Sequence, residues 1–178
     1  MRDTGRVTIH SEHPFLPPDK DRDPVRRFRG HMPAPVTVWT TGAESLREGW
    51  TVSSLVIADG QPARLVGLMD EDADFVDRLR ETGVFVVNLL TAEHRLLADA
   101  FARVGPAPGG PFTLGSWSTS EWGPVLDDAA GWLGARWNGV EASLGWPMLI
   151  EAEIEHAEVS ESSPAPMMHL RGRYEDPQ

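Results

Sequence analysis

Residues 148–159 alternate apolar and charged side chains with a period of two, which constrains the fold more than any other part of the chain. Ile150, Ala152 and Ile154 fall on one side, and the positions between them are glutamates. A strand with this pattern has one buried face and one face in water, which is typical of antiparallel sheets. The pattern therefore favours a mainly β fold.

Short runs of β-branched and aromatic residues recur elsewhere, each bounded by turn residues. They predict strands at residues 36–41, 51–57, 63–69, 84–90, 132–137 and 167–174. Helical patterns occupy residues 25–32, 72–82 and 91–101, and residues 105–124 are expected to form a long loop. Because turns alone separate the early strands, we predict an antiparallel barrel with peripheral short helices rather than a doubly wound parallel sheet.

The charge balance excludes several classes of partner. The 178 residues carry 27 acidic and 16 basic side chains, a formal charge of −11. Nucleic acids and anionic membrane surfaces require clustered Lys and Arg, so neither is expected as a partner. The chain contains no cysteine, which excludes disulfides and thiolate chemistry and makes the cytoplasm the expected compartment. Residues 1–27 are predicted to be a Pro-rich, charged arm without the features of a signal peptide, followed by one domain over residues 28–178.

Two polar features stand out within the apolar strands. Thr51, Ser53 and Ser54 follow the turn at Gly49 and offer hydroxyl and amide groups to an anionic or carbonyl-rich ligand, or they satisfy only local backbone. Asn88 lies inside an apolar strand, where a buried amide must have hydrogen-bond partners. It is either a structural link or a ligand contact.

Aromatic and cationic residues suggest where a ligand would lie. The chain has seven tryptophans, and Trp50 is one of those suited either to stack on a planar ring or to pack in the core. The segment His169 to Tyr174 places Arg171 and Arg173 between two aromatic rings, which suits either a bound anion or an ion pair between subunits. The six histidines are scattered and none has the spacing of a zinc pair, so no metal site is predicted.

Taken in order, these segments resemble the flavin-reductase-like family. Residues 36–41 match its first strand, and residues 49–54 match its Gly-Met-Thr-Val-Ser-Ser segment. Residues 83–90 match its Gly-x-Phe-x-Val-Asn-Val-Leu strand, residues 123–126 its Gly-x-Pro-x-Leu motif, and residues 171–174 its closing Arg-Gly-Arg-Tyr. The resemblance implies a six-stranded antiparallel split β-barrel of the FMN-binding type that forms a homodimer.

The resemblance also implies a reaction and a site. The reaction is transfer of a hydride from NADH or NADPH to FMN or FAD, as in the reductase component of a two-component monooxygenase, with the monooxygenase as a partner. The implied cofactor contacts are Trp50, Thr51, Val52, Ser53, Ser54, Leu68, Met69, Asp70, Asn88, His169, Arg171, Arg173 and Tyr174. No catalytic side chain is implied, because the cofactor performs the chemistry.

The chain departs from the family pattern in two places. Where the family has a Ser/Thr/Arg-rich turn that holds the flavin phosphate, residues 70–74 are Asp-Glu-Asp-Ala-Asp, and carboxylates repel a phosphate. The histidine of the family's Gly-Asp-His turn is replaced by Trp146. Two alternatives therefore stay open: a barrel that binds flavin or another small ligand without catalysis, and an enzyme that uses a deazaflavin.

Overall fold

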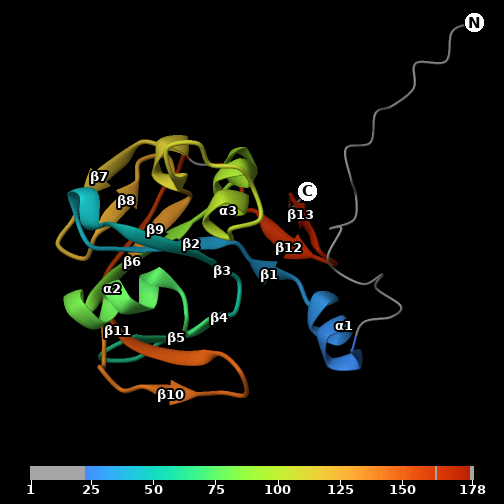
Figure 1. Ribbon diagram of the computed structural model, residues 1–178, viewed down its shortest axis with the longest axis horizontal. Coiled ribbons are helices and arrows are strands. Elements are labelled where there is room, and N and C mark those ends of the chain that lie inside the picture. The colour runs from blue at the N-terminus through green and yellow to red at the C-terminus, as the bar shows by residue number, and fades with distance from the viewer. Residues whose placement is uncertain (1–22, 163, 177–178) are drawn as a thin grey trace, which may run out of the picture.

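The computed structural model of the protein describes residues 23–162 and 164–176. Its main feature is a strongly curled antiparallel sheet of eight strands (Figure 1). The strands are β2 (Thr37–Thr41), β3 (Glu48–Val52), β4 (Leu55–Ala58), β5 (Arg64–Met69), β6 (Val84–Leu89), β9 (Gly131–Trp137), β10 (Ala142–Ser143) and β11 (Met148–Val159). Their order is β3-β2-β6-β9-β11-β5-β4, and β10 pairs with β11.

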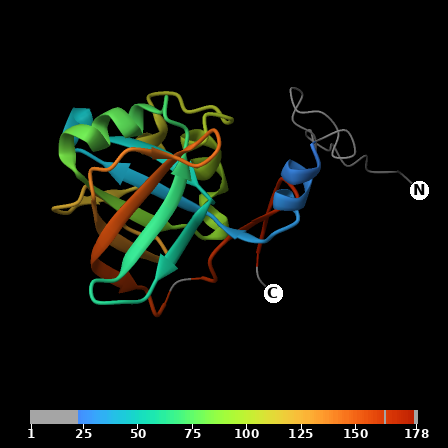
Figure 2. The same ribbon diagram turned by 90° about the horizontal axis from the view of Figure 1, so that it is seen from below.

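The two ends of this sheet are formed by one stretch of chain. β3 and β4 lie at opposite ends of the strand order, yet only Ser53 and Ser54 separate them in sequence. Val52 pairs with Thr37 of β2, whereas Leu55 pairs with Gly67 of β5. The same stretch therefore borders both ends of the sheet and curls it into a half-barrel (Figure 2).

This architecture confirms the predicted antiparallel split barrel. The expected strand at residues 51–57 is interrupted at Ser53 and Ser54, and the hairpin at residues 142–143 adds the short β10. If β3 and β4 are taken as one interrupted strand and β10 is set aside, six long strands remain, as expected.

The barrel interior is built around Trp39. Its indole is fully buried, stacks on Phe85 at 4.7 Å between ring centroids, and meets Phe75 edge-on at 6.4 Å. The ring also reaches β5, where a Cβ added to Gly67 would lie 2.4 Å from its Cη2 atom. α2 (Asp74–Thr82) contributes Phe75 to this core, together with Val76 and Leu79. Gly83 then ends the helix in the left-handed conformation at φ 69°.

A second apolar cluster lies on the outer face of β2. α3 (Arg95–Phe101), preceded by the short turn η3 (Ala92–His94), packs Leu97 and Phe101 against Val36 and Val38. η4 (Pro111–Leu114) and the hairpin of β7 (Trp117–Thr119) and β8 (Pro124–Leu126) complete this layer, and η2 (Glu44–Leu46) joins β2 to β3. The expectation of a plain loop over residues 105–124 is therefore wrong, because Phe112 and Trp117 pack on Phe101 and order the segment.

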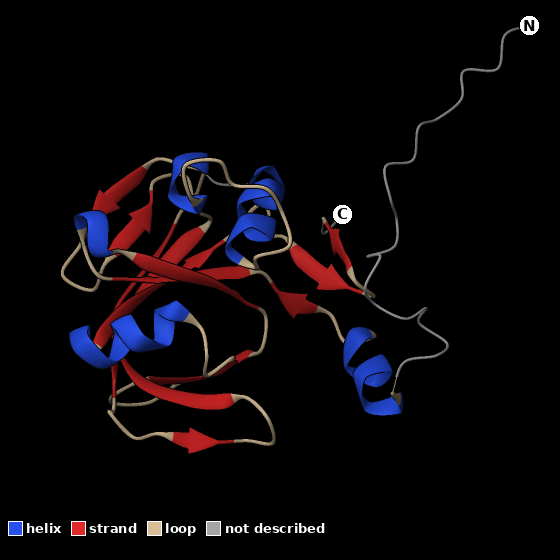
Figure 3. Ribbon diagram, viewed as in Figure 1, coloured by secondary structure: helices blue, strands red, loops and turns tan. Residues whose placement is uncertain are grey.

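A small sheet projects from the barrel beside α1 (Pro24–Gly30), as Figure 3 shows. It has the order β1 (Ala34–Pro35), β12 (Met168–Leu170), β13 (Arg173–Glu175). The single strand predicted for residues 167–174 is thus a hairpin, whose turn residues Arg171 and Gly172 both have positive φ. α1 spans the predicted boundary between residues 27 and 28, while residues 1–22 of the predicted arm lie outside the described part. None of the described helices is long and apolar enough to cross a bilayer.

Candidate functional site

The predicted flavin-contacting segment at residues 50–54 begins on β3, where its side chains alternate between two environments. Trp50 and Val52 pack against the barrel core. Thr51 faces the opposite side, and its hydroxyl donates a hydrogen bond of 2.7 Å to the carbonyl oxygen of Ala98 on α3. The strand therefore presents Trp50 and Thr51 to different surroundings, and Thr51 is fixed by α3.

Ser53 and Ser54 follow at the junction between β3 and β4, and both are half-buried. The carbonyl oxygen of Ser54 accepts a hydrogen bond of 2.9 Å from the amide of Leu68, so the end of β5 lies beside the two serines. Leu68 is half-buried, Met69 is buried and Asp70 is exposed. Within the described residues neither serine hydroxyl has a hydrogen-bond partner, which leaves both hydroxyls for a ligand.

The acidic turn at residues 70–74 follows directly after β5. Its three consecutive carboxylates, at residues 70–72, are exposed to solvent. Asp74 forms an ion pair of 2.7 Å with Arg103, whose guanidinium also lies 5.8 Å from the centroid of the Trp50 ring. The turn is therefore negatively charged, and the cation nearest to Trp50 is already paired with a carboxylate.

Asn88 makes its hydrogen bonds within the protein. It is fully buried, and its amide nitrogen donates to the carbonyl oxygen of Val38 and to the Thr40 hydroxyl, both at 3.1 Å. Its amide oxygen accepts from the backbone N–H of Leu126 at 2.8 Å. This geometry favours the structural alternative for Asn88, a link that joins β8 to the main sheet, over direct contact with a ligand.

His169 and Tyr174 face each other across the β12–β13 hairpin, with ring centroids 5.8 Å apart. The Tyr174 hydroxyl donates a hydrogen bond of 2.9 Å to Asp99 on α3. Burial, and then the neighbouring Asp99, raise the pKa of Tyr174 above its usual range. Burial, and then the positive charge of Arg29, lower the pKa of His169 below its ordinary value.

Arg171 and Arg173 are exposed on the same hairpin. The backbone amide of Arg171 donates to the carbonyl oxygen of Gly30 at 2.6 Å, which fixes the hairpin turn against the end of α1. Because both residues are exposed, their side chains are in contact with solvent. They are accessible to an anion.

The predicted contacts therefore form two groups rather than one. The first comprises residues 50–54 and 68–70 at the junction of β3, β4 and β5, and the second comprises residues 169–174 on the projecting hairpin. α3 touches both groups, because Ala98 accepts the hydrogen bond of Thr51 and Asp99 accepts that of Tyr174. α3 is thus the element that links them.

The lowered pKa of His169 predicts a stability change in mild acid. Protonation favours the unfolded state, in which the imidazole has its ordinary pKa of about 6.5. The contribution of neutral His169 to the stability of the folded state is therefore fully present above about pH 6.5. It is lost as the pH falls through the lower pKa of the folded state. Urea unfolding at a series of pH values should show this loss in the wild type and a shallower pH dependence in His169→Asn; equal slopes would contradict the assignment.

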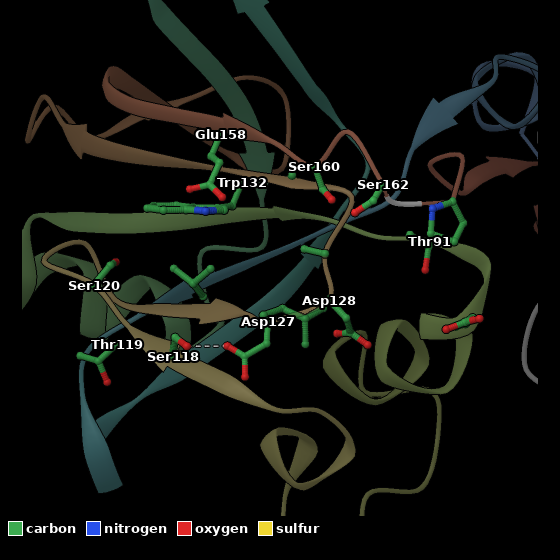
Figure 4. A pocket seen from close by; sticks show the side chains of 16 residues that line it. Thr91, Ser118, Thr119, Ser120, Asp127, Asp128, Trp132, Glu158, Ser160 and Ser162 are labelled. Atoms are coloured by element: carbon green, nitrogen blue, oxygen red, sulfur yellow. Dashed lines mark hydrogen bonds between the residues drawn. The ribbon is translucent and has the colours of Figure 1, made fainter.

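A cavity of about 560 Å³ among the described residues was not predicted from the sequence. Trp132 and Glu158 form one wall, facing the β7–β8 hairpin with Ser118 and Asp127 (Figure 4). None of the predicted cofactor contacts lines it. The run of three hydroxyl residues at 118–120 and the acidic pair at 127–128 are the sequence signals that could have indicated it.

Comparison with known proteins agrees with the fold. The structure of the flavin reductase PheA2 superposes with a TM-score of 0.76 at 20% identity, over 86% of this chain and 96% of that one. The NADH:FAD oxidoreductase SgcE6 of Streptomyces globisporus C-1027 superposes with a TM-score of 0.77 at 25% identity, over 92% and 97% of the two chains. The fold thus defines a split-barrel protein of the flavin reductase type.

The sequence places it in a particular family. The family model for the flavin reductase like domain matches residues 29–178, so the chain belongs to this family. It is 30% identical over 105 residues to an FMN reductase (NADH), RutF, of Agrobacterium fabrum, covering 58% of this chain and 60% of that one. It is 27% identical over 155 residues to an NADH-dependent FMN reductase, AsuE2, of Streptomyces nodosus subsp. asukaensis, covering 86% and 83%. The chain thus matches about 60% of the length of the RutF relatives.

Proposed function

We propose that this protein catalyses the transfer of a hydride from NADH or NADPH to FMN or FAD. The observation that carries the proposal is the junction at Ser53 and Ser54 in a chain of the flavin reductase like family. There, two half-buried hydroxyls that have no hydrogen-bond partner among the described residues lie beside the end of β5. Relatives named NADH-dependent FMN reductases support the same reaction.

The residues at the junction fit the ring and the hydroxylated side chain of a flavin. The partly buried Trp50 supplies an apolar surface beside the ring, and the serines supply hydrogen bonds to carbonyl and hydroxyl groups. When bound, flavin accepts the hydride on its ring system, so the role of the protein is to orient donor and acceptor and to exclude water. We assign contact with the nicotinamide or a phosphate to His169, Tyr174 and the two arginines of the hairpin, which α3 contacts through Asp99.

The test is anaerobic bleaching of the visible flavin absorption by NADH and by NADPH, with catalytic amounts of protein. We expect bleaching well above a protein-free blank. The double variant Ser53→Ala/Ser54→Ala is expected to lower kcat/KM about tenfold, the sum of two hydrogen bonds of about 0.7 kcal/mol each. Ser116→Ala, at an exposed serine before β7, serves as the matched control. Bleaching no faster than in the blank would refute the proposal.

The carboxylates at residues 70–72 bear on which flavin is preferred. They are exposed where the family holds the phosphate, so the chain binds flavin mainly through its ring and accepts riboflavin about as well as FMN. Arg171 and Arg173 are the alternative phosphate contacts. A strong preference for FMN that is abolished by Arg171→Ala or Arg173→Ala would place the phosphate on the hairpin instead.

The second candidate function is flavin binding without reductase activity. It is favoured by Trp146, which stands at the position of the family histidine and is 94% exposed on the β10–β11 hairpin. Under this alternative, flavin quenches tryptophan fluorescence but neither nicotinamide reduces it. A deazaflavin in the same bleaching assay tests the remaining redox alternative.

The proposal includes two protein partners: a second copy of the chain, and a monooxygenase that receives the reduced flavin. For the homodimer, the edge strand β4 exposes Val56 at 65% and Ile57 at 50%, and an exposed apolar sheet edge suits contact with a second copy. The structure of BorF, the flavin reductase component of a bacterial two-component tryptophan halogenase, has the same fold, with a TM-score of 0.73 at 22% identity over 85% of this chain. Light scattering of the purified chain measures the oligomeric state directly.

A further inference from the structure

The cavity beneath Trp132 lies far along the sheet from the proposed flavin site. Its walls come from β7, β8, β9 and the end of β11, together with the segment after β6. β9 is the fourth strand in the order that begins with β3 and ends with β4. The cavity is therefore a separate feature of the molecule and takes no part in the junction of β3, β4 and β5.

The side chains that line the cavity set its charge. Four of them are carboxylates, Glu93, Asp127, Asp128 and Glu158, and no lysine or arginine is present among the described residues of the lining. Serine and threonine hydroxyls make up most of the remaining polar surface. Such a lining repels phosphates and carboxylates and attracts positive charge.

Trp132 gives the cavity an aromatic wall. Its ring stacks on that of His156, with centroids 4.3 Å apart at 28°, which holds the indole in place. The same ring lines the cavity opposite Ser118, Ser120 and Asp127 (Figure 4). Among the aromatic side chains, the indole of tryptophan attracts a cation most strongly.

The two aspartates are each held at one oxygen. Ser118 donates a hydrogen bond of 2.5 Å to Oδ1 of Asp127. Oδ1 of Asp128 lies 3.1 Å from Nε2 of His94. Each carboxylate is thus oriented by the protein, and in the described part of the chain no hydrogen bond occupies its second oxygen.

His94 supports the cavity wall from behind Asp128. Its side chain is only 7% exposed, and Nδ1 lies 3.1 Å from the backbone N–H of Thr91, which donates to it, so the proton is on Nε2. Nε2 is buried and has no well-aligned hydrogen bond among the described residues, although it is directed at Asp128 on the cavity wall. Buried polar atoms are normally paired, and the carboxylate of Asp128 is the group that Nε2 faces, so His94 positions this carboxylate on the cavity wall.

The volume of the cavity and the spacing of its carboxylates favour an organic cation over a metal ion. No group of three or more His, Asp or Glu side chains in residues 23–162 and 164–176 converges closely enough to hold a metal. The carboxylates instead surround a space of about 560 Å³. From these observations we propose that the cavity binds a compact organic cation, an amine whose ammonium group meets Asp127 and Asp128 and whose flat or apolar body lies on Trp132.

The proposal is tested by calorimetric titration of the full chain with three ligands of the same shape: 2-phenylethylamine, 2-phenylethanol and phenylacetate. We expect the amine to bind with a Kd on the order of 1 mM, and the alcohol and the acid to bind at least about tenfold more weakly. Added salt should weaken binding of the amine, because the contacts are partly exposed charges. Equal binding of amine and alcohol would overturn the proposal, and so would absence of amine binding.

Variants locate the site. Asp127→Asn/Asp128→Asn should weaken binding of the amine about tenfold, the effect of losing hydrogen bonds to charged groups. Glu161→Gln, an exposed carboxylate outside the lining, is the matched control and should bind as the wild type does. Unchanged binding in the double variant would overturn the proposal. Because the readout is binding and not flavin reduction, the outcome is independent of the proposed reductase function.

Discussion

Replacing Trp39 with alanine is expected to lower the free energy of unfolding by about 3–5 kcal/mol, the usual cost of removing a large aromatic side chain from a core. The indole is fully buried and stacks on Phe85. It also fills the space beside Gly67. Alanine at position 39 would leave a cavity across the middle of the barrel, and denaturant unfolding measures the loss directly.

Trp146→Ala is the matched control, because this tryptophan is 94% exposed. Its free energy of unfolding should change by no more than about 0.5 kcal/mol. Trp39→Phe should fall between the two, since it keeps an aromatic ring against Phe85. If Trp39→Ala lowered the free energy of unfolding by less than about 1 kcal/mol, the barrel would have collapsed around the deleted ring, and the prediction of a cavity would be wrong.

Asn88→Leu is expected to lower the free energy of unfolding by about 3 kcal/mol or more, because it removes three hydrogen bonds from a buried network. These bonds join Asn88 to the carbonyl oxygen of Val38, the hydroxyl of Thr40 and the backbone N–H of Leu126. The Thr40 hydroxyl retains its bond of 2.5 Å to the carbonyl oxygen of Pro124. Of the two side-chain hydrogen bonds that join β8 to the main sheet, at Leu126 and at Pro124, the second would remain.

Two comparisons make this second prediction decisive. Asn138→Ala changes an exposed asparagine whose side chain bonds only within its own turn, and it should cost less than about 1 kcal/mol. Thr40→Val removes one member of the same buried network and should cost less than Asn88→Leu, which keeps the series interpretable if the leucine variant does not fold. If Asn88→Leu were as stable as the wild type but no longer bound flavin, Asn88 would be a ligand contact rather than a structural link.

Much of the fold could be predicted because local patterns and tertiary environment agree. The alternation at residues 148–159 gives β11 at its observed bounds, since one face of that strand is buried and the other is in water. α2 was indicated by acidic residues in its first turn and by Gly83 after its end. Both elements could be predicted because the signals lie in the residues that form them or directly beside them.

The errors occur where distant contacts determine the structure. β7 has no alternating pattern, and it is ordered by Trp117 packing on Phe101 and Phe112. The hairpin of β12 and β13 was taken for one strand, although the sequence Arg171-Gly172 supplies the two left-handed residues that a tight turn requires. The strand expected at residues 51–57 breaks because its two halves pair with different neighbours, β2 and β5.

The functional features were less accessible to sequence reasoning than the fold. Residues 50–54 and 68–70 were expected to act together, and the hydrogen bond from Leu68 to Ser54 joins them. The segment at residues 169–174 was expected beside them, yet it lies on a separate sheet. The hydroxyl run at residues 118–120 and the acidic pair at 127–128 mark parts of the cavity under Trp132, but no local pattern indicates that they meet the segment after β6 and the end of β11.

The stretch that contains Ser53 and Ser54 borders both ends of the curled sheet, which has a consequence for local opening. Amide hydrogens of the β2–β3 ladder and of the β4–β5 ladder belong to opposite ends of the strand order but share this one stretch. A molecule bound at the two serines would hold both ladders closed, because it binds the closed state only. The amides of the β2–β3 ladder and those of the β4–β5 ladder should then become more protected from hydrogen exchange together.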